Sequence, residues 1–202
     1  MINRRSFIAC IALAIPAVPR LAAAHPSGPF ELDRAYMPQE VAFTFGYAAG
    51  AIVVDTAARF LYLVEEEGRA RRYGIGVGRA GLAWSGTAEV GRKAKWPSWT
   101  PTPNMIRREP RKYAKFADGV PGGPSNPLGS RALYLYRNGR DTYFRIHGTT
   151  EPWTIGKAVS NGCIRLINEH VEDLYERVAV GATVIVLQTK APSAGRGAHG
   201  SS

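Results

Sequence analysis

The feature that most constrains the fold is a pair of alternating apolar runs, residues 132–136 and 142–146, with Asn138-Gly139 between them. An Asn-Gly pair flanked by two such runs is a strong signal for a β-hairpin with a tight turn. His147 follows the second run directly, so it should lie at the end of the returning strand. A chain organised around this hairpin is expected to be rich in β-structure.

Short apolar runs elsewhere predict further strands. They lie at residues 52–55, 60–64, 71–77 and 183–187. The first three should form a meander, with residues 65–68 as the turn between the last two. From Asn168 the period becomes helical, and Asn168 is placed to cap a helix that ends near Gly181. The apolar face of that helix is Val171, Leu174, Tyr175 and Val178. The fold class is therefore mainly β with a small α component.

Residues 79–130 show neither the alternation of a strand nor the period of a helix clearly. They are dense in Gly and Pro and contain Trp84, Trp96 and Trp99 among basic residues. A long irregular stretch inside a compact domain is usually functional or mobile. This stretch is expected to form either one wall of a substrate cleft or a plain surface loop.

The N-terminal residues 1–24 have the pattern of a signal peptide. Arg4 and Arg5 precede an almost wholly apolar run at residues 7–18, and three alanines at residues 22–24 make a small-residue cleavage site. The apolar run is shorter than the roughly 20 residues that a membrane-spanning helix needs. We expect export to the periplasm with cleavage near Ala24, either by the twin-arginine route or by an ordinary secretory signal.

Composition divides the rest of the chain into three parts. Residues 25–47 form a leader of obscure role, residues 48–189 form the main domain, and residues 190–202 form a polar tail that should be disordered. Cleavage removes three arginines and no acidic residue, so the net charge of +10 becomes +7. A basic surface attracts polyanions. Export argues against nucleic acid as the partner, whereas peptidoglycan stems with free carboxylates would fit.

Cleavage also leaves Cys163 as the only cysteine. In an oxidising compartment such a thiol is a buried inert group, an intermolecular bridge or a reactive nucleophile. A thiol needs deprotonation to react, and His147, 16 residues upstream, could supply an imidazole for that purpose. Gly162 and Cys163 could present backbone N–H groups to a developing oxyanion, and Arg165 offers a cation for a substrate carboxylate.

These residues together resemble a known signature. His147 is followed by a segment that contains Ser160, Asn161, Gly162, Cys163, Ile164 and Arg165. This pattern resembles that of the L,D-transpeptidases (YkuD-type, ErfK/YbiS-like), in which a histidine precedes Ser/Thr-His-Gly-Cys, a hydrophobic residue, and Asn or Arg. The resemblance extends over residues 51–187 and includes residues 126–129 before the hairpin.

The resemblance implies a β-sandwich-like domain with one helix after the catalytic cysteine. It also implies two-step acyl transfer, in which Cys163 attacks the third-residue carbonyl of a tetrapeptide stem, releases D-alanine and passes the acyl group to an amine in a 3-3 cross-link. In the family the carbonyl after the base histidine, here that of Gly148, orients the ring. Ser160 belongs to the same orienting set, and neither a metal nor a cofactor is implied.

One position departs from the signature, because Asn161 stands where the family usually has histidine. Asparagine cannot exchange protons near neutral pH, but its amide can donate a hydrogen bond. Other outcomes of the same chemistry remain open: hydrolysis of the acyl-enzyme (L,D-carboxypeptidase activity), attachment of an outer-membrane protein through its amine, or a wall-binding module without activity.

Overall fold

The computed structural model describes residues 30–80 and 82–187. The predicted signal peptide (1–24), the first residues of the leader (25–29) and the predicted tail (190–202) lie outside the described residues. None of the helices in the described ranges is long and apolar enough to cross a membrane.

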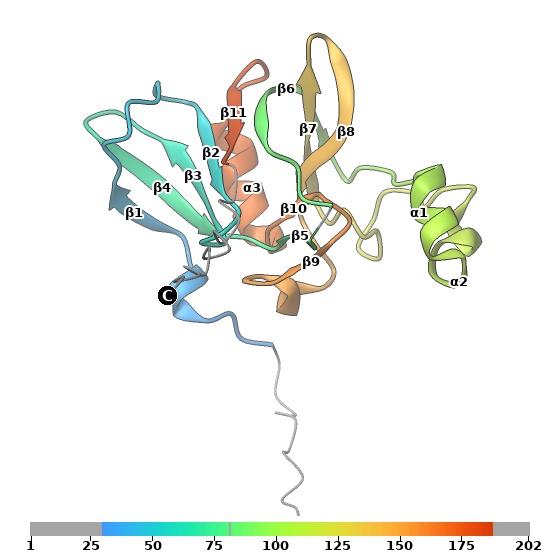
Figure 1. Cartoon of the computed structure of the whole chain (residues 1–202). Coiled ribbons are helices and arrows are strands. Elements are labelled where there is room, and N and C mark those ends of the chain that lie inside the picture. Colours follow the sequence, from blue (N-terminus) through green and yellow to red (C-terminus); the bar gives the residue numbers. More distant parts are fainter. Residues whose placement is uncertain (1–29, 81, 188–202) are drawn as a thin grey trace, which may run out of the picture.

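The described chain contains eleven strands in two sheets (Figure 1). In chain order they are β1 (Gln39–Ala42), β2 (Ile52–Asp55), β3 (Phe60–Val64), β4 (Arg69–Gly74), β5 (Val77–Gly78), β6 (Gly86–Lys95), β7 (Arg131–Arg137), β8 (Arg140–His147), β9 (Ala158–Ser160), β10 (Ile164–Arg165) and β11 (Thr183–Val186). Nine form one sheet in the order β1-β4-β3-β2-β11-β6-β7-β8-β10, and β5 pairs with β9 in a second, parallel sheet.

Helices are few and short. They are α1 (Pro103–Arg108), α2 (Pro110–Tyr113) and α3 (Asn168–Arg177), with 3-10 turns η1 (Arg34–Tyr36), η2 (Ala114–Phe116) and η3 (Pro152–Thr154). The prediction of a mainly β fold with a small α component is confirmed. In Figure 1, α1 and α2 project to one side of the sheets, whereas α3 lies against them.

One apolar core joins both halves of the large sheet. Alternate residues of β2, β3, β7 and β11 enter it, and α3 covers it with Val171 and Leu174. The opposite face of β2–β4 carries a smaller cluster around Phe43 and Val53. Because the period of a strand is two, these two clusters lie on opposite faces of the same strands. Both faces of β2–β4 are therefore covered by apolar side chains.

The structure differs from the sequence-based prediction in its middle. Residues 79–130 are not irregular throughout, because β6 is the longest strand and pairs with both β11 and β7. Only Ala88 and Val90 of its ten residues are buried. Charged residues and glycine fill most of the other positions, so the strand lacks the apolar alternation by which strands are found. Residues 39–42 of the expected leader also pair, with β4.

Other boundaries also shift. The strand expected at residues 71–77 is β4 followed by the separate β5. Asn168 does not cap α3, since Ile167 is the N-cap residue and makes no side-chain cap. Instead, Asn168 Oδ1 accepts a hydrogen bond from the Ser130 backbone N–H (3.1 Å), which ties α3 to the start of β7. The helix ends at Arg177, ahead of the predicted Gly181.

Asp173 fastens α3 to β4. Its carboxylate accepts hydrogen bonds from Arg71 Nε (2.7 Å), from the hydroxyl of the fully buried Tyr73 (2.7 Å) and from Arg177 Nε (2.8 Å). Partial burial disfavours the charge on Asp173, but these three donors outweigh it and hold the pKa of the carboxyl below its usual value.

Asp173→Ala is expected to lower the free energy of unfolding by about 2 kcal/mol, because it leaves the Tyr73 hydroxyl buried without a partner. Denaturant titration would measure the loss. The depressed pKa means that this stabilisation is present above the carboxyl's ordinary pKa and is lost as the pH falls through the lower folded value. Glu172→Ala is the matched control, since that half-exposed side chain reaches only Arg131 at 3.8 Å. Equal losses in both variants would contradict the assigned role of Asp173.

Candidate active site

The end of the hairpin and the segment after Cys163 lie side by side. β10 pairs with β8 in parallel, so that Ile164 lies beside Ile146 and Arg165 beside His147. The Leu166 N–H then donates to the His147 carbonyl (2.9 Å). This register is what brings the cysteine loop to the last residues of β8, although 16 positions separate His147 from Cys163 in the chain.

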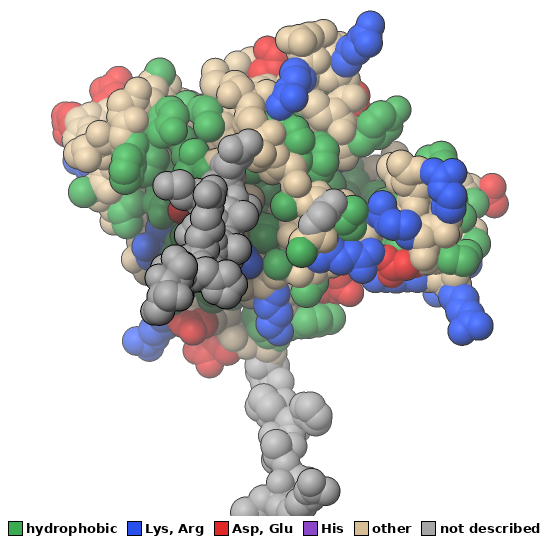
Figure 2. Space-filling view, in the orientation of Figure 1, with side chains coloured by type: hydrophobic (Ala, Val, Ile, Leu, Met, Phe, Trp, Pro, Cys, Tyr) green, Lys and Arg blue, Asp and Glu red, His purple; other side chains and the backbone are tan. Residues whose placement is uncertain are grey.

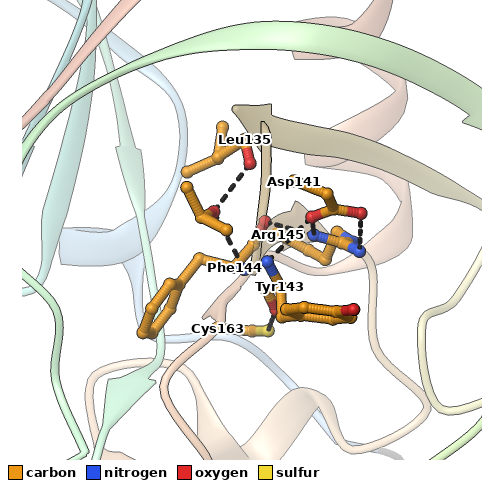
Figure 3. Close-up of polar contacts among 7 residues, drawn as sticks. Leu135, Asp141, Tyr143, Phe144, Arg145 and Cys163 are labelled. Atoms are coloured by element: carbon orange, nitrogen blue, oxygen red, sulfur yellow. Dashed lines mark hydrogen bonds and ion pairs between the residues drawn. The ribbon is translucent and has the colours of Figure 1, made fainter. Parts of the chain in front are cut away.

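A bulge in β8 shapes the surroundings of the thiol (Figure 3). Arg145 makes a two-pronged ion pair with Asp141 (2.7 and 2.8 Å), and the Asp141 carboxylate also accepts from the Tyr143 N–H (2.8 Å). Tyr143 has a positive φ of 62°, a strained conformation for a bulky residue. Its carbonyl oxygen lies 3.9 Å from Cys163 Sγ. The strained carbonyl therefore faces the sulfur.

His147 is buried, and its ring is oriented by the next residue. Nδ1 lies 2.5 Å from the Gly148 carbonyl oxygen. A carbonyl only accepts hydrogen bonds, so Nδ1 carries the proton in the neutral ring. Burial, reinforced by the positive charge of Arg165, lowers the pKa of His147 to about 3. The imidazole is thus neutral throughout the physiological range.

Cys163 is half-buried, and burial raises the pKa of its thiol. The backbone N–H of Arg145 and the charges of Arg145 and Arg165 oppose this effect without overcoming it. With the thiol pKa raised and the imidazole pKa lowered, the resting site holds a neutral thiol and a neutral imidazole. If such a thiol acts as a nucleophile, its proton has to leave during the attack, because no thiolate is stored beforehand.

The turn before Cys163 is held by Ser160. Its hydroxyl donates to the Cys163 carbonyl (2.6 Å) and accepts from the Gly162 N–H (3.1 Å). The Gly162 N–H is therefore occupied, contrary to the expectation that it faces an oxyanion. Gly162 has φ 124°, and an added Cβ would lie 2.7 Å from the Phe144 ring and 2.8 Å from the Leu82 carbonyl oxygen. Only glycine fits this turn without displacing the cysteine.

The Asn161 amide is engaged on both sides. Its Nδ2 donates to the Tyr113 hydroxyl (2.6 Å), and its Oδ1 accepts from Arg79 (3.3 Å) and Arg108 (3.2 Å). These contacts point the amide toward α1 and α2. The expected role of Asn161 in shaping the oxyanion site therefore has no contact that supports it.

Arg165 is not a free cation. Its Nη1 forms an ion pair with Glu151 at 2.7 Å, and its side chain is 18% exposed. A substrate carboxylate would have to compete with Glu151 for this guanidinium. The expected role of Arg165 in binding a stem carboxylate remains a prediction. In the structure, the positive charge of Arg165 contributes to the lowered pKa of His147.

Several contacts around the site were not predicted from the sequence. Asp141 and Arg145 are four apart, a spacing that a regular strand does not bring together, so only the bulge reveals their pairing. The Trp84 ring stacks on Phe144 with 5.5 Å between centroids, which brings one tryptophan of residues 79–130 beside the cysteine turn. In residues 30–80 and 82–187 there is no group of three or more His, Cys, Asp or Glu side chains arranged to hold a metal.

The family model and the relatives named next agree on one family. A model of the L,D-transpeptidase catalytic domain (YkuD) matches residues 49–186. The chain is 34% identical over 155 residues to the probable L,D-transpeptidase ErfK/SrfK of Escherichia coli K12, covering 75% of this chain and 48% of that protein. It is 37% identical over 140 residues to a putative L,D-transpeptidase of Fuscovulum blasticum, covering 67% of this chain and 68% of that protein.

The chain spans about half the length of the Escherichia coli relatives that it matches. Among solved structures, one from Brucella melitensis, described as a probable carnitine operon oxidoreductase, is 56% identical with a TM-score of 0.53, over 77% of this chain and 96% of that one. That description applies to the Brucella protein. The family model and the Fuscovulum blasticum relative carry the family assignment.

Proposed function

The chain belongs to the L,D-transpeptidase catalytic-domain family, and from this premise we propose that it is a cysteine acyltransferase of peptidoglycan peptide stems, with Cys163 as nucleophile and His147 as base. The observation that carries the proposal is the β8–β10 register, which brings the cysteine loop against the strand that ends in His147. The buried imidazole, oriented by the Gly148 carbonyl, supports the assignment of the base.

The donor half of the reaction begins as Cys163 Sγ attacks the carbonyl carbon of the third stem residue. The thiol proton passes to His147 Nε2, and the carbonyl oxygen becomes an oxyanion. The Cys163 N–H is the donor that the loop offers to it, because the Gly162 N–H is held by Ser160. When the oxyanion collapses, the carbon–nitrogen bond breaks, the imidazolium protonates the departing D-alanine amine, and a thioester remains on Cys163.

The acceptor half reverses these roles. An amine attacks the thioester carbon, His147 takes a proton from that amine, and the sulfur leaves and recovers its proton. A stem amine gives a 3-3 cross-link, and we propose this outcome for the chain. Water or the amine of an outer-membrane protein could attack the same thioester. The product therefore depends on which nucleophile has access to the thioester on Cys163. We further propose export to the periplasm, where the stems are found.

The proposal predicts a covalent intermediate on Cys163. Incubation with a purified disaccharide-tetrapeptide is expected to add the mass of the stem minus D-alanine to the protein, because the thioester keeps the acyl group. A carbapenem, which offers a strained acyl donor, should label the same residue. Intact-protein mass spectrometry followed by peptide mapping would measure both adducts.

Cys163→Ala is the control for this experiment and should acquire no adduct. Resolution of the small products separates dimer, tripeptide and unreacted stem, and so identifies the acceptor. A folded protein with a titratable thiol that acquires neither adduct would contradict the proposed function and favour a wall-binding module.

A further inference from the structure

Two side chains leave the small sheet at the same edge. β5 and β9 run parallel, so their carboxyl ends lie together, and the Arg79 N–H donates to the Ser160 carbonyl (3.1 Å). Arg79 directly follows β5, and Asn161 directly follows β9. Asn161 is two residues from Cys163 in the chain, and Arg79 is hydrogen-bonded to Ser160, which itself bonds the Cys163 carbonyl.

A third group reaches this edge from a distant part of the chain. Residues 103–116, here called the helical arm, comprise α1, α2 and η2 and project beside the sheets (Figure 1). Tyr113 of the arm is buried, packs edge-on against Trp99 at 6.2 Å, and accepts a hydrogen bond from Asn161. Arg108 of the arm donates to Asn161 Oδ1. The arm is thus fastened to the nucleophile loop through one amide.

Two guanidinium groups consequently converge on a single neutral oxygen. Asn161 Oδ1 accepts from Arg79 and Arg108, each about 3.3 Å away or less. Arg79 also has an ion pair with Glu109, and the positive charge beside Glu109 lowers the pKa of that carboxyl. Arg108 is exposed and makes no ion pair within the part of the chain that the structure describes.

The arm adds to this positive field. Among residues 103–116 there are five Lys and Arg and one Glu, a net charge of +4, and Figure 2 shows Lys and Arg side chains gathered over it. Glu109 already serves as the counter-ion of Arg79, whereas the amide oxygen of Asn161 does not neutralise Arg108. A substrate carboxylate would neutralise Arg108, and its two oxygens match the planar guanidinium group.

We propose that Arg108, held beside Arg79 by Asn161, forms a subsite for a free carboxylate of the stem peptide, next to the loop that carries Cys163. This inference rests on the proposed function and adds a specificity to it: stems with the free carboxylate bind better than their amidated counterparts. Arg165, which the sequence suggests for this task, is already paired with Glu151. Arg108 is the cation that has room for a substrate.

This arrangement explains why Asn161 replaces the histidine of the family signature. Asn161 gives an oxygen to two arginines and an N–H to Tyr113 at the same time. A neutral imidazole has one acceptor and one donor nitrogen, so it cannot bind all three partners. Asparagine at this position fastens the helical arm, and with it the carboxylate subsite, to the cysteine loop.

Arg108→Gln is the direct test. Binding of tetrapeptide stems to the Cys163→Ala protein, measured by calorimetry, should weaken by about 10- to 100-fold when Arg108 is replaced, the range expected for a charged hydrogen-bonded contact. Three further stems, each amidated at one carboxylate (D-glutamate, diaminopimelate or terminal D-alanine), locate the group. One of these stems lacks the carboxylate that Arg108 binds. That stem should bind weakly even to the Cys163→Ala protein that keeps Arg108, and Arg108→Gln should weaken its binding no further.

Arg107→Gln is the matched control, because this exposed neighbour on the same helix contacts only Asn104. It should leave the affinity for every stem unchanged. Asn161→His should reduce the preference for the free carboxylate while the thiol still reacts with iodoacetamide, since it releases the arm and not the nucleophile.

The outcomes separate the subsite from the reaction. Equal loss with all four stems in Arg108→Gln, or equal loss in Arg107→Gln, would overturn the subsite even if the wild-type protein becomes acylated. Carboxylate-dependent binding without any acylation of the wild-type protein would uphold the subsite and overturn the proposed function.

Discussion

Cys163→Ser is expected to lower the rate of acyl transfer by about 10⁴-fold or more, the scale on which loss of a catalytic nucleophile acts. A serine hydroxyl is far less acidic than a thiol, and the base that would have to activate it is weak. The pKa of His147 is lowered to about 3 by burial and by Arg165, so the imidazole has little affinity for a proton. Release of D-alanine from a tetrapeptide stem, followed by chromatography, measures the rate.

The Cys163→Ser protein should keep its fold, because the Cys163 side chain is half-buried and serine is only slightly smaller than cysteine. Equal denaturation midpoints for the two proteins are the control. Substantial turnover by the serine variant would mean that the protonation states of Cys163 and His147 differ from those that their pKa values indicate, or that another residue forms the acyl-enzyme.

His147→Ala is expected to lower the acylation rate by about 10²- to 10⁴-fold, the usual contribution of a general base. The thiol pKa is raised by burial, so without the imidazole almost no thiolate forms near neutral pH. In the His147→Ala protein the acylation rate should therefore rise with pH until the pH reaches the pKa of the Cys163 thiol. In the wild-type protein the rate should stay level through pH 6.5, because His147 is already neutral there. Stopped-flow acylation by a carbapenem across the pH range measures both profiles.

His147→Gln is the companion variant, since its amide can still donate to the Gly148 carbonyl and fill part of the buried space. It should fold like the wild-type protein and be as slow as His147→Ala. A wild-type profile that falls with an apparent pKa near 6.5 would contradict a buried neutral imidazole, and would indicate a resting thiolate–imidazolium pair.

The strands that the sequence reveals are those with apolar side chains on alternate positions. Residues 60–64 and the hairpin around Asn138-Gly139 were predicted almost to the residue because the main core demands that alternation. β6 carries charge and glycine over most of its length and is held by backbone pairing to β11 and β7 on its two sides. Long-range pairing of that kind leaves no local pattern, so the strand could not be recognised.

The site shows the same division. The family resemblance indicated His147, Cys163 and the carbonyl of Gly148, and the pairing of β8 with β10 brings together the segments that carry them. The partners of Asn161 lie 48 to 82 positions away, at Tyr113, Arg108 and Arg79. Which of the many arginines meet at that amide is decided by how the helical arm returns to the small sheet. Only the folded chain contains that information.

The position of β11 has a consequence for how the protein is made. This strand is the last in the described chain, yet it lies in the middle of the large sheet, pairing with β2 on one side and β6 on the other. Val184 is registered with Ile52, so closing the sheet joins residues about 130 positions apart, and such non-local pairing is slow. A ribosome-bound or C-terminally truncated chain lacks the strand that unites the two halves of the core. We therefore expect the main core, and the strands that hold the loop of Cys163, to reach their final packing only once β11 has been synthesised and paired.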